Sequence, residues 1–323
     1  MSTIPVVSIV IPTYNAEPWL EEAVRSALSQ TLTDIEVLVF DNASTDATPD
    51  LMARISDPRL SYFRAAENIG FAGNVTRGIE AARGRYFLVL GADDVLKPTF
   101  LAEAVALLDA DPAASMLHGR AIWIDDDGAP IGVMRGTWPA KSSGEDAFLR
   151  TFTEGFCYST VISRTEHVKR LQAMDERWGM ISDSWLFLKM CLAGEVLFLD
   201  TPLVLYRVRD SSLSFELYAD GKMFNDHLMG LEQAFSWPEA APLRPRAREA
   251  RLAVALQAFD TMHMTRIGAG LSGMLAKSWQ VTQAVPGILL SPRAWLRFAF
   301  ALLPATTIQW LRNWRRTVAI DQQ

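Results

Sequence analysis

Cysteine is scarce in this sequence of 323 residues, which has two, Cys157 and Cys191, far apart in the chain. Their number and spacing fit neither a disulfide framework nor a cysteine metal site, so a reducing, cytoplasmic compartment is expected. No basic residue precedes the short apolar run at the N-terminus, and a signal peptide is therefore not expected. The uncharged stretch 298–311 has 14 residues, fewer than the roughly 20 that a membrane-spanning helix needs.

Two phosphate-binding signatures are also absent. No G-x-G-x-x-G motif follows the first predicted strand, which argues against a dinucleotide-binding dehydrogenase. The loop after that strand, PTYNAE, has neither glycine nor lysine. A nucleotidyltransferase that makes activated sugars usually has a glycine-rich, basic loop here, so this class is kept only as an alternative.

Half of the residues are hydrophobic, which is enough to bury a sizeable core. The length suits two domains, or one large domain with an extension. The formal net charge is −6, but residues 243–323 hold 11 basic and 3 acidic residues. A basic end on an acidic body suggests contact with an anionic surface, and a solvated basic helix face explains the same charges equally well.

The first hundred residues alternate between strand and helix patterns, which predicts an α/β fold with a mostly parallel sheet and helices on both faces. Short β-branched or apolar runs predict strands at 6–11, 35–40, 60–64 and 86–90. Amphipathic segments predict helices at 17–28, 46–55, 71–83 and 98–108. Further on, the patterns predict a β-hairpin over 115–134, a strand at 158–163, a helix at 185–192, a strand at 196–199 and a long helix at 247–265.

Polar residues follow each of the predicted strands of this first region. Ligands of a doubly wound sheet bind at the C-terminal ends of its strands, so these side chains are expected along one edge of the sheet. They are Thr13, Tyr14 and Asn15, then Asp41, Asn42 and Ser44, then Asn68, and finally Asp93 and Asp94.

The pair Asp93 and Asp94 is the sharpest of these features. Two adjacent acids directly after an apolar strand, YFLVL, repel each other unless a cation or hydrogen-bond donors neutralise them. Hard oxygen ligands suit Mg²⁺ or Mn²⁺, and these ions in turn suit a diphosphate. A cap for the helix at Pro98 is the structural alternative, but one acid would serve for that. Asp41 alone is a weak signal, since an Asp after a strand often only caps a turn.

Five segments, in the right order over roughly residues 5–215, resemble the large family 2 of inverting glycosyltransferases with a GT-A fold. VSIVIPTYNAEPWLEEAVRSALSQT is similar to the opening strand and helix of that family, and EVLVFDNASTDAT to its second strand with the nucleotide-binding Asp. ENIGFAGNVTRGIEAARGRYFLVLGADD resembles the donor-side helix and metal motif. MDERWGMISDSWLFLKMCLAG resembles the segment with the catalytic base, and YRVRDSSLS the element that closes the site.

The resemblance implies roles for individual residues. Asp183 lies where the family has the base that takes the proton of the acceptor hydroxyl. Asp93 and Asp94 would serve ribose and a Mn²⁺ or Mg²⁺ ion that neutralises the departing diphosphate. Asp41 would hydrogen-bond the base of a UDP-, GDP- or dTDP-sugar. The remaining donor-side residues that the resemblance implies are Thr13, Tyr14, Asn15, Glu17, Asn68 and Asn74.

Three positions depart from the family pattern. Gly91 replaces the first acid of the metal motif, so metal binding depends on Asp93 and Asp94. Ser182 replaces the Glu before the base, and a helix cap is the alternative role for Asp183. Arg209 replaces the His of the closing element, where an arginine can pair directly with the diphosphate.

These observations predict a GT-A domain over residues 1–215 and a helical region over 216–323. The leading function is transfer of a sugar from a nucleoside diphosphate to a saccharide or lipid-linked saccharide, in bacterial surface polysaccharide or glycolipid assembly. A non-catalytic sugar-nucleotide-binding or scaffolding protein is the alternative from another class, although Asp183 and both adjacent acids are present. No nucleic-acid partner is expected, and an oligomer is possible.

The C-terminal residues 285–316 combine short apolar segments, three prolines, tryptophans and arginines. This composition is typical of an interfacial membrane anchor, so the inner face of the membrane is a possible location. A helical bundle that packs on the first domain or on a second copy is the alternative. The residues concerned are Trp295, Trp310, Trp314, Arg293, Arg297, Arg312, Arg315 and Arg316.

Overall fold

The computed structural model of the chain describes residues 4–134, 136–171, 174, 182–209, 222–304 and 306–308. The chain divides into two compact units, of which the first contains residues 1–128, 133–148 and 156–207. The second contains residues 129–132, 149–155 and 208–323. The domain boundary predicted at residue 215 lies outside the described residues.

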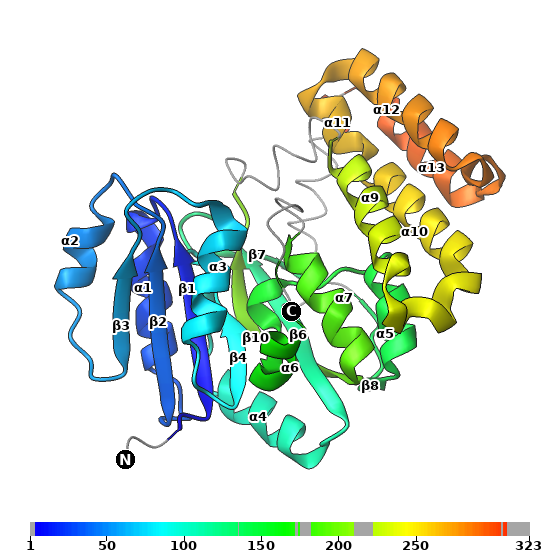
Figure 1. Ribbon diagram of the computed structural model, residues 1–323. Coiled ribbons are helices and arrows are strands. Elements are labelled where there is room, and N and C mark those ends of the chain that lie inside the picture. Colours follow the sequence, from blue (N-terminus) through cyan, green and yellow to red (C-terminus); the bar gives the residue numbers. More distant parts are fainter. Residues whose placement is uncertain are drawn as a thin grey trace. The chain divides into compact units, whose positions relative to one another are not determined.

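The first unit is built on one mixed sheet (Figure 1), whose main path has the order β3-β2-β1-β4-β9-β6-β10-β5. Its long strands pair in parallel, β1 with β2 and β4, β2 with β3, and β6 with β10. The short strands β9 and β5 pair antiparallel with their neighbours. The strands are β1 (Val7–Thr13), β2 (Ile35–Asp41), β3 (Leu60–Arg64), β4 (Tyr86–Val89), β5 (Val95–Leu96), β6 (Ala114–Ile124), β7 (Pro130–Val133, shared with the second unit), β8 (Lys141–Ser142), β9 (Ile162–Arg164) and β10 (Glu195–Arg207).

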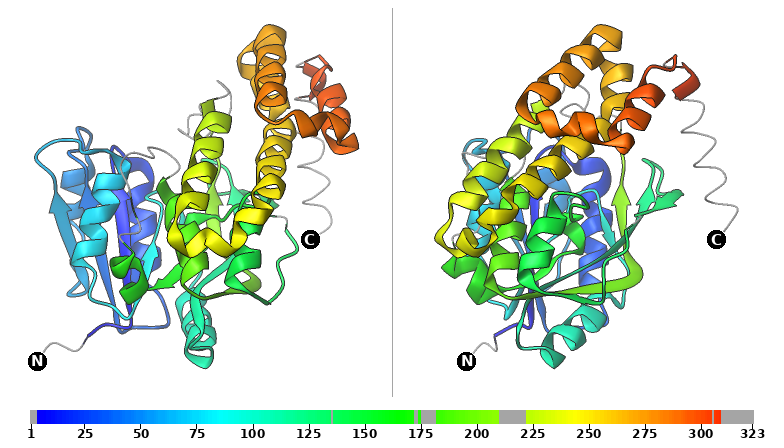
Figure 2. Two further views of the ribbon diagram at one scale, coloured as in Figure 1. Left: turned by 45° about the vertical axis from the view of Figure 1, so that its right-hand side comes forward. Right: turned by 90° about the vertical axis from the view of Figure 1, so that its right-hand side faces the viewer.

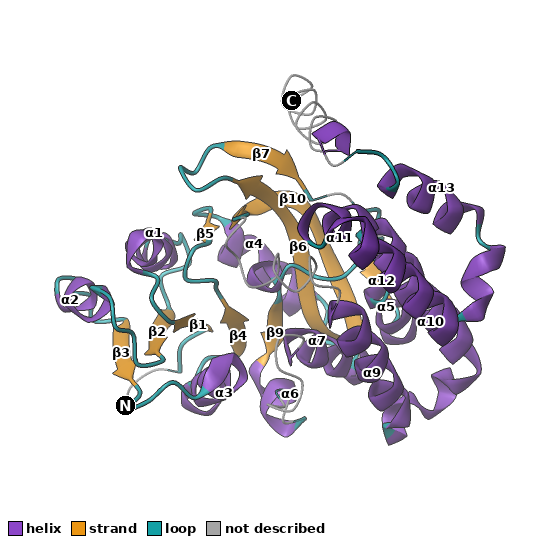
Figure 3. Ribbon diagram, turned by 90° about the horizontal axis from the view of Figure 1, so that it is seen from above, coloured by secondary structure: helices purple, strands orange, loops and turns teal. Residues whose placement is uncertain are grey.

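Helices cover both faces of this sheet (Figure 3), with α1 and α4 on one face and α3 and α6 on the other. The first face holds a large apolar core in which Ile9, Leu20 and Leu101 are fully buried. On the other face α3 lies very close to β1, because a Cβ at Gly78 would come within 2.3 Å of Val10. The helices of this unit are α1 (Glu17–Leu28), α2 (Thr48–Ala53), α3 (Gly70–Ala81), α4 (Phe100–Ala110), α5 (Gly144–Thr151, shared with the second unit), the 3₁₀ turn η1 (Tyr158–Thr160), α6 (Thr165–Arg170) and α7 (Ser182–Ala193).

The sequence predicted the strands and helices of the first hundred residues except the two-residue strand β5. The hairpin turn is also present, with Gly128 N–H donating to the Asp125 carbonyl at 3.1 Å. The prediction of a strand over 158–163 is wrong in its first half, where the chain forms η1 before β9. The strand predicted at 196–199 is the beginning of β10, which continues to Arg207 after a register shift between Leu199 and Val204. This interruption hid the second half of the strand from the apolar pattern.

Apart from β7, the regular secondary structure in the described part of the second unit is helical (Figure 2). The long helix predicted at 247–265 is interrupted, because α10 ends at Asp260 and the Thr261 hydroxyl donates back to the Gln257 carbonyl at 3.1 Å. None of the helices in the described part of the chain has the length and apolar character that a bilayer crossing requires. The helices are α9 (Lys222–Ser236), η3 (Pro238–Arg246), α10 (Ala247–Asp260), α11 (Met262–Gly268), α12 (Gly270–Ala284), η4 (Pro286–Leu290) and α13 (Pro292–Ala301).

Candidate active site

The loops after β1 and β2 are tied together by side chains. Asn15 adopts a left-handed φ of 50°, its N–H donates to Ser44 Oγ at 2.9 Å, and its Oδ1 accepts the N–H of Thr45 at 2.8 Å. The N–H of Glu17 donates to the carboxylate of Asp46 at 3.1 Å. Thr13 is buried at the end of β1, whereas Tyr14 is half exposed. Of Thr13 and Tyr14, it is therefore Tyr14 that offers accessible surface to a ligand.

Asp41 is completely buried at the end of β2. Its carboxylate accepts the N–H of Ser44 at 2.8 Å and the hydroxyl of Tyr62 at 2.5 Å, and it forms an ion pair with Arg64 at 3.2 Å. The Asp41 carboxylate raises the pKa of Tyr62 further above its ordinary value, after the larger effect of burial. Asp41 therefore supports the loop after β2 in addition to lying at the end of that strand.

The asparagines on the donor side hold the start of α3 against β2. Asn68 Oδ1 accepts from the Asn42 side chain at 2.7 Å and from the N–H of Gly70 at 2.9 Å. The buried Asn74 donates to the Phe40 carbonyl at 2.6 Å. Asn74 is therefore a structural link between α3 and β2, and Asn68 lies nearer to the exposed end of the loop.

Asp94 is buried, and Asp93 beside it is half-buried. Asp94 Oδ2 accepts the hydroxyl of Ser159 at 2.5 Å, and Oδ1 accepts the N–H of Arg207 at 2.9 Å. Burial, followed by the charge of Asp93, raises the pKa of Asp94 to about 7. The two carboxylates therefore resist ionising together, which is the condition that a divalent cation relieves.

The donor set fits such a cation, since carboxylate oxygens are the ligands that Mg²⁺ and Mn²⁺ take in proteins. Within the described residues no three His, Cys, Asp or Glu side chains converge on a metal position. Sites of this kind commonly use one or two carboxylates and complete the coordination with water and substrate phosphates. Asp93 and Asp94 would hold the ion in this way.

The structure explains why position 91 has no acid. A Cβ on Gly91 would lie 2.6 Å from Asp94 Oδ2 and 2.9 Å from the hydroxyl of Tyr158. The Gly91 N–H donates to Ser159 Oγ at 3.0 Å, so the Ser159 hydroxyl contacts both Gly91 and Asp94. The space that a longer side chain would take is filled by Tyr158.

Arg207, at the end of β10, is the basic residue that fixes this loop. Its side chain is almost fully buried, and its guanidinium donates to the Asp93 carbonyl at 3.0 Å and to the carbonyls of Asp125 and Asp126 at 2.8 and 2.9 Å. It also pairs with Glu22 of α1 at 2.8 Å. Arg207 therefore connects α1, the acidic loop and the hairpin turn.

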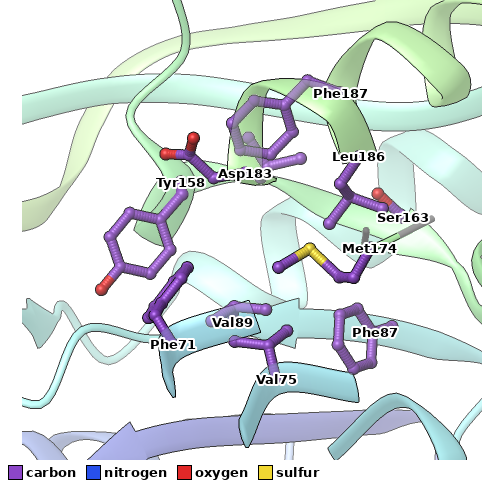
Figure 4. A pocket seen from close by; sticks show the side chains of 11 residues that line it. Phe71, Val75, Phe87, Val89, Tyr158, Ser163, Met174, Asp183, Leu186 and Phe187 are labelled. Carbon is purple, nitrogen blue, oxygen red and sulfur yellow. The ribbon is translucent and has the colours of Figure 1, made fainter. Parts of the chain in front are cut away.

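Asp183 lies in the first turn of α7, where its Oδ1 accepts the N–H of Ser184 at 2.6 Å. It borders a pocket whose other lining is mostly apolar, with side chains from α3, β4, η1, β9 and α7 (Figure 4). Burial in these surroundings raises the pKa of Asp183 to about 6. A carboxylate with this pKa is ionised at neutral pH and more basic than an exposed Asp, as a general base should be. Its place in the first turn of α7 fits the expected role at a helix terminus, and its raised pKa is what a base would need.

Asp183 and the two adjacent acids belong to one electrostatic neighbourhood. The pKa of Tyr206 is raised by burial, and then by the nearby charges of Asp94, Asp93 and Asp183, among others. Burial likewise raises the pKa of Cys157, with further contributions from Asp94 and Asp183. Tyr158 lines the pocket that Asp183 borders, and its hydroxyl would lie 2.9 Å from a Cβ on Gly91, so two parts of the sequence more than eighty residues apart lie at one site.

Sequence reasoning missed four residues that build this site, Tyr158, Ser159, Tyr206 and Arg207. Nothing in the pattern of η1 indicated contact with the strand end of β4. Arg207 lies in the segment YRVRDSSLS, where the family pattern singles out Arg209 instead. Arg209 follows β10 by two residues and belongs to the second unit. Ser182, the position of the missing Glu, is fully buried at the start of α7.

The sequence matches the family description Glycosyl transferase family 2 over residues 8–169, half of the chain. One similar protein is the succinoglycan biosynthesis protein ExoO of Rhizobium meliloti, 29% identical over 242 residues that cover 72% of this chain and 68% of that protein. Two solved structures resemble the chain in fold. TarS of S. aureus in complex with UDP-GlcNAc has a TM-score of 0.61 at 16% identity, and covers 91% of this chain and 90% of that one. The mannosyltransferase PcManGT from Pyrobaculum calidifontis in complex with GDP-Man and Mn²⁺ has a TM-score of 0.60 at 20% identity, and the match covers 96% of this chain and 88% of that one. With the sheet order, the strand-end acids and the family match in agreement, the chain belongs to glycosyl transferase family 2 and has its GT-A fold.

Proposed function

We propose that the protein is an inverting glycosyltransferase that moves a sugar from a UDP-, GDP- or dTDP-sugar to the hydroxyl of an acceptor. The observation that carries the proposal is the meeting of two adjacent acids, suited to a diphosphate-bound cation, with a third acid of raised pKa. Three carboxylates in these separate roles are what a metal-assisted displacement at an anomeric carbon needs.

In the proposed reaction Asp183 accepts the proton of the acceptor hydroxyl as its oxygen attacks the anomeric carbon. The new glycosidic C–O bond forms on the face opposite the diphosphate, so the configuration at that carbon is inverted. The bond from the anomeric carbon to the diphosphate breaks, and the nucleoside diphosphate leaves with the electron pair. When bound, Mn²⁺ or Mg²⁺ supplies positive charge to this leaving group.

The donor's nucleoside is proposed to lie along the ends of β1 and β2. Tyr14 is half exposed there and Glu17 is partly exposed, so both can contact a base or ribose. Asp41 is completely buried, so it would contact the base only after Tyr62 or Arg64 moves aside, while Thr13, Asn15, Asn68 and Asn74 shape the loops. Arg209 would pair with the diphosphate.

The acceptor is proposed to be a saccharide or a lipid-linked saccharide, handled on the cytoplasmic side of a membrane. One relative is named for succinoglycan biosynthesis, so assembly of a bacterial surface polysaccharide or glycolipid is the process that we propose. The basic C-terminal region supports a location at an anionic surface.

A screen for thermal stabilisation by nucleoside diphosphates and their sugars, with Mn²⁺ present, tests the donor class. Stabilisation by one nucleotide series, lost on chelation, is the expected result. The donor that emerges can then be incubated with acceptor saccharides, and the anomeric configuration of the product read by NMR. A product that retains the donor's configuration would overturn the single-displacement role of Asp183.

A further inference from the structure

The exposed large hydrophobic side chains of the described residues are concentrated in one region. Nine of the sixteen lie between residues 271 and 303, on α12, η4 and α13 and the residues just after α13. A monomer exposes scattered apolar residues as a matter of course, but a concentration like this marks an interaction surface.

On α12 the exposed residues form one stripe. Leu271, Leu275 and Trp279 are spaced at i, i+4 and i+8, which places them on the same side of the helix. Met274 and Val281, on other positions of α12, are fully buried. The helix therefore packs with its other side and presents leucine and tryptophan to its surroundings.

The segment of η4 and α13 presents a second group of the same kind. Leu290 is 84% exposed, Leu296 71% and Trp295 54%, while Ala294 and Ala301 are buried. Trp295 Nε1 donates to the Leu289 carbonyl at 2.9 Å, which fixes the indole ring against η4. The N-terminus of α13 is capped by Ser291, whose side chain accepts the N–H of Ala294. The exposed residues thus belong to ordered, capped structure.

Arginines accompany these apolar groups, and acids do not. Asp260 pairs with both Arg293 and Arg297 of α13, and the sequence has no further acid until Asp321. Residues 261–320 contain seven basic residues and no acidic one. Ion pairs between exposed side chains are weak, so the two arginines can also reach external phosphates.

We propose that Leu271, Leu275, Trp279, Leu290, Trp295 and Leu296, here called the apolar stripe, bind an anionic lipid surface, with Arg293 and Arg297 contacting lipid phosphates. Leucine and tryptophan beside arginine is the combination that inserts into the boundary between head groups and acyl chains. The chain beyond residue 308 continues this composition, with Trp310, Trp314, Arg312, Arg315 and Arg316. The charge complements anionic lipid, and the apolar residues match its interior.

The proposed lipid-binding surface thus includes α12 as well as the region after residue 285. Lipid binding by this surface does not depend on the chemistry at Asp183, because no residue of the apolar stripe belongs to the first unit. A failed donor screen would not count against lipid binding, and a failure to bind lipid would not count against the proposed sugar transfer.

Flotation of the full chain with vesicles tests it. Vesicles that contain phosphatidylglycerol should carry the protein to the top of the gradient at low salt, and pure phosphatidylcholine vesicles should carry less. The triple variant Leu275→Ser, Trp279→Ser, Leu296→Ser should reduce the bound fraction at least tenfold. Arg293→Gln with Arg297→Gln should reduce binding to the anionic vesicles and leave the weak binding to phosphatidylcholine unchanged.

The matched control is the pair Met229→Ser and Leu107→Ser, two exposed apolar residues outside the stripe. This control should float like the wild type, and all variants should retain the wild-type melting temperature because the changed residues are exposed. Equal loss in the control, or no flotation of the wild type, would overturn the proposal. So would a wild-type dimer that the triple variant converts to a monomer without any flotation, since the stripe would then bind a second copy.

Discussion

Arg207 holds Asp94 through its backbone N–H, at 2.9 Å, while its guanidinium holds the carbonyl of the preceding Asp93, at 3.0 Å. A residue 113 positions later in the chain therefore fixes both acids at the end of β4. The guanidinium also donates to two carbonyls of the hairpin turn, so its removal leaves several part-buried acceptors without this donor.

Replacing Arg207 by Met should lower the free energy of unfolding by about 3 kcal/mol, at the upper end for hydrogen bonds of a charged group. Mn²⁺-dependent affinity for the nucleoside diphosphate should fall at least about tenfold, because the acidic loop loses its support. Denaturant unfolding and calorimetry measure the two effects. The control Glu22→Gln removes only a partner that is 55% exposed, and should cost less than about 1 kcal/mol. Equal effects in both variants would refute the positioning role of Arg207.

Asp183→Asn should reduce transfer by a factor of about 10² to 10⁴, the usual contribution of a general base, and leave donor binding intact. Because the raised pKa of Asp183 means that its ionised form is disfavoured in the folded chain, the amide should leave stability unchanged or higher at pH 7. Steady-state kinetics and thermal melts give both results. Asp200→Asn, at an exposed ion pair with Arg120, is the control and should keep full activity. Wild-type rates in Asp183→Asn would reduce this residue to a helix cap.

The pH dependence of kcat/KM should have an acid limb near pH 6. Burial raises the pKa of Asp183 to about 6, and a base must be deprotonated, so activity should be constant well above pH 6 and fall with unit slope below it. The profiles are measured with saturating Mn²⁺, so that a change in metal binding does not contribute to the fall in activity at low pH. A limb near pH 4, the range of an exposed Asp, would show that the apolar surroundings do not act on the base.

Gly91→Ala should weaken Mn²⁺-dependent nucleotide binding, because the added methyl group meets the Asp94 carboxylate and the Tyr158 hydroxyl. The shift of either group disturbs the contacts that hold Asp94. Gly155→Ala is the matched control, since nothing lies within 4 Å of its added methyl group. Adding Tyr158→Phe to Gly91→Ala should restore only part of the affinity, because the clash with Asp94 remains. Full affinity in Gly91→Ala alone would contradict the described packing.

The sheet and its site edge could be predicted because their signals are local. β1, β2 and β4 are almost fully buried and mostly apolar, and the polar residues that follow them stand out by contrast. The double acid after β4 indicated a cation by charge repulsion alone, which needs no knowledge of the fold.

The residues that complete the site could not be predicted, because their roles arise from contacts distant in sequence. Ser159 has the pattern of any small residue in a short apolar segment, and its bond to Asp94 spans 65 positions. Arg207 ends a strand whose second half follows a register shift. The part of the apolar stripe on α12 could not be predicted, because a helix with apolar residues on several sides does not show which side packs.

Calorimetry of nucleoside diphosphates tests the central claim most directly. UDP, GDP and dTDP are titrated into the wild-type chain with Mn²⁺, with Mg²⁺ and after chelation, and again into Asp94→Asn. The account predicts that one of the three binds, that chelation abolishes most of the affinity, and that Asp94→Asn loses the dependence on metal. Absence of binding by all three nucleotides in the presence of either metal would contradict it.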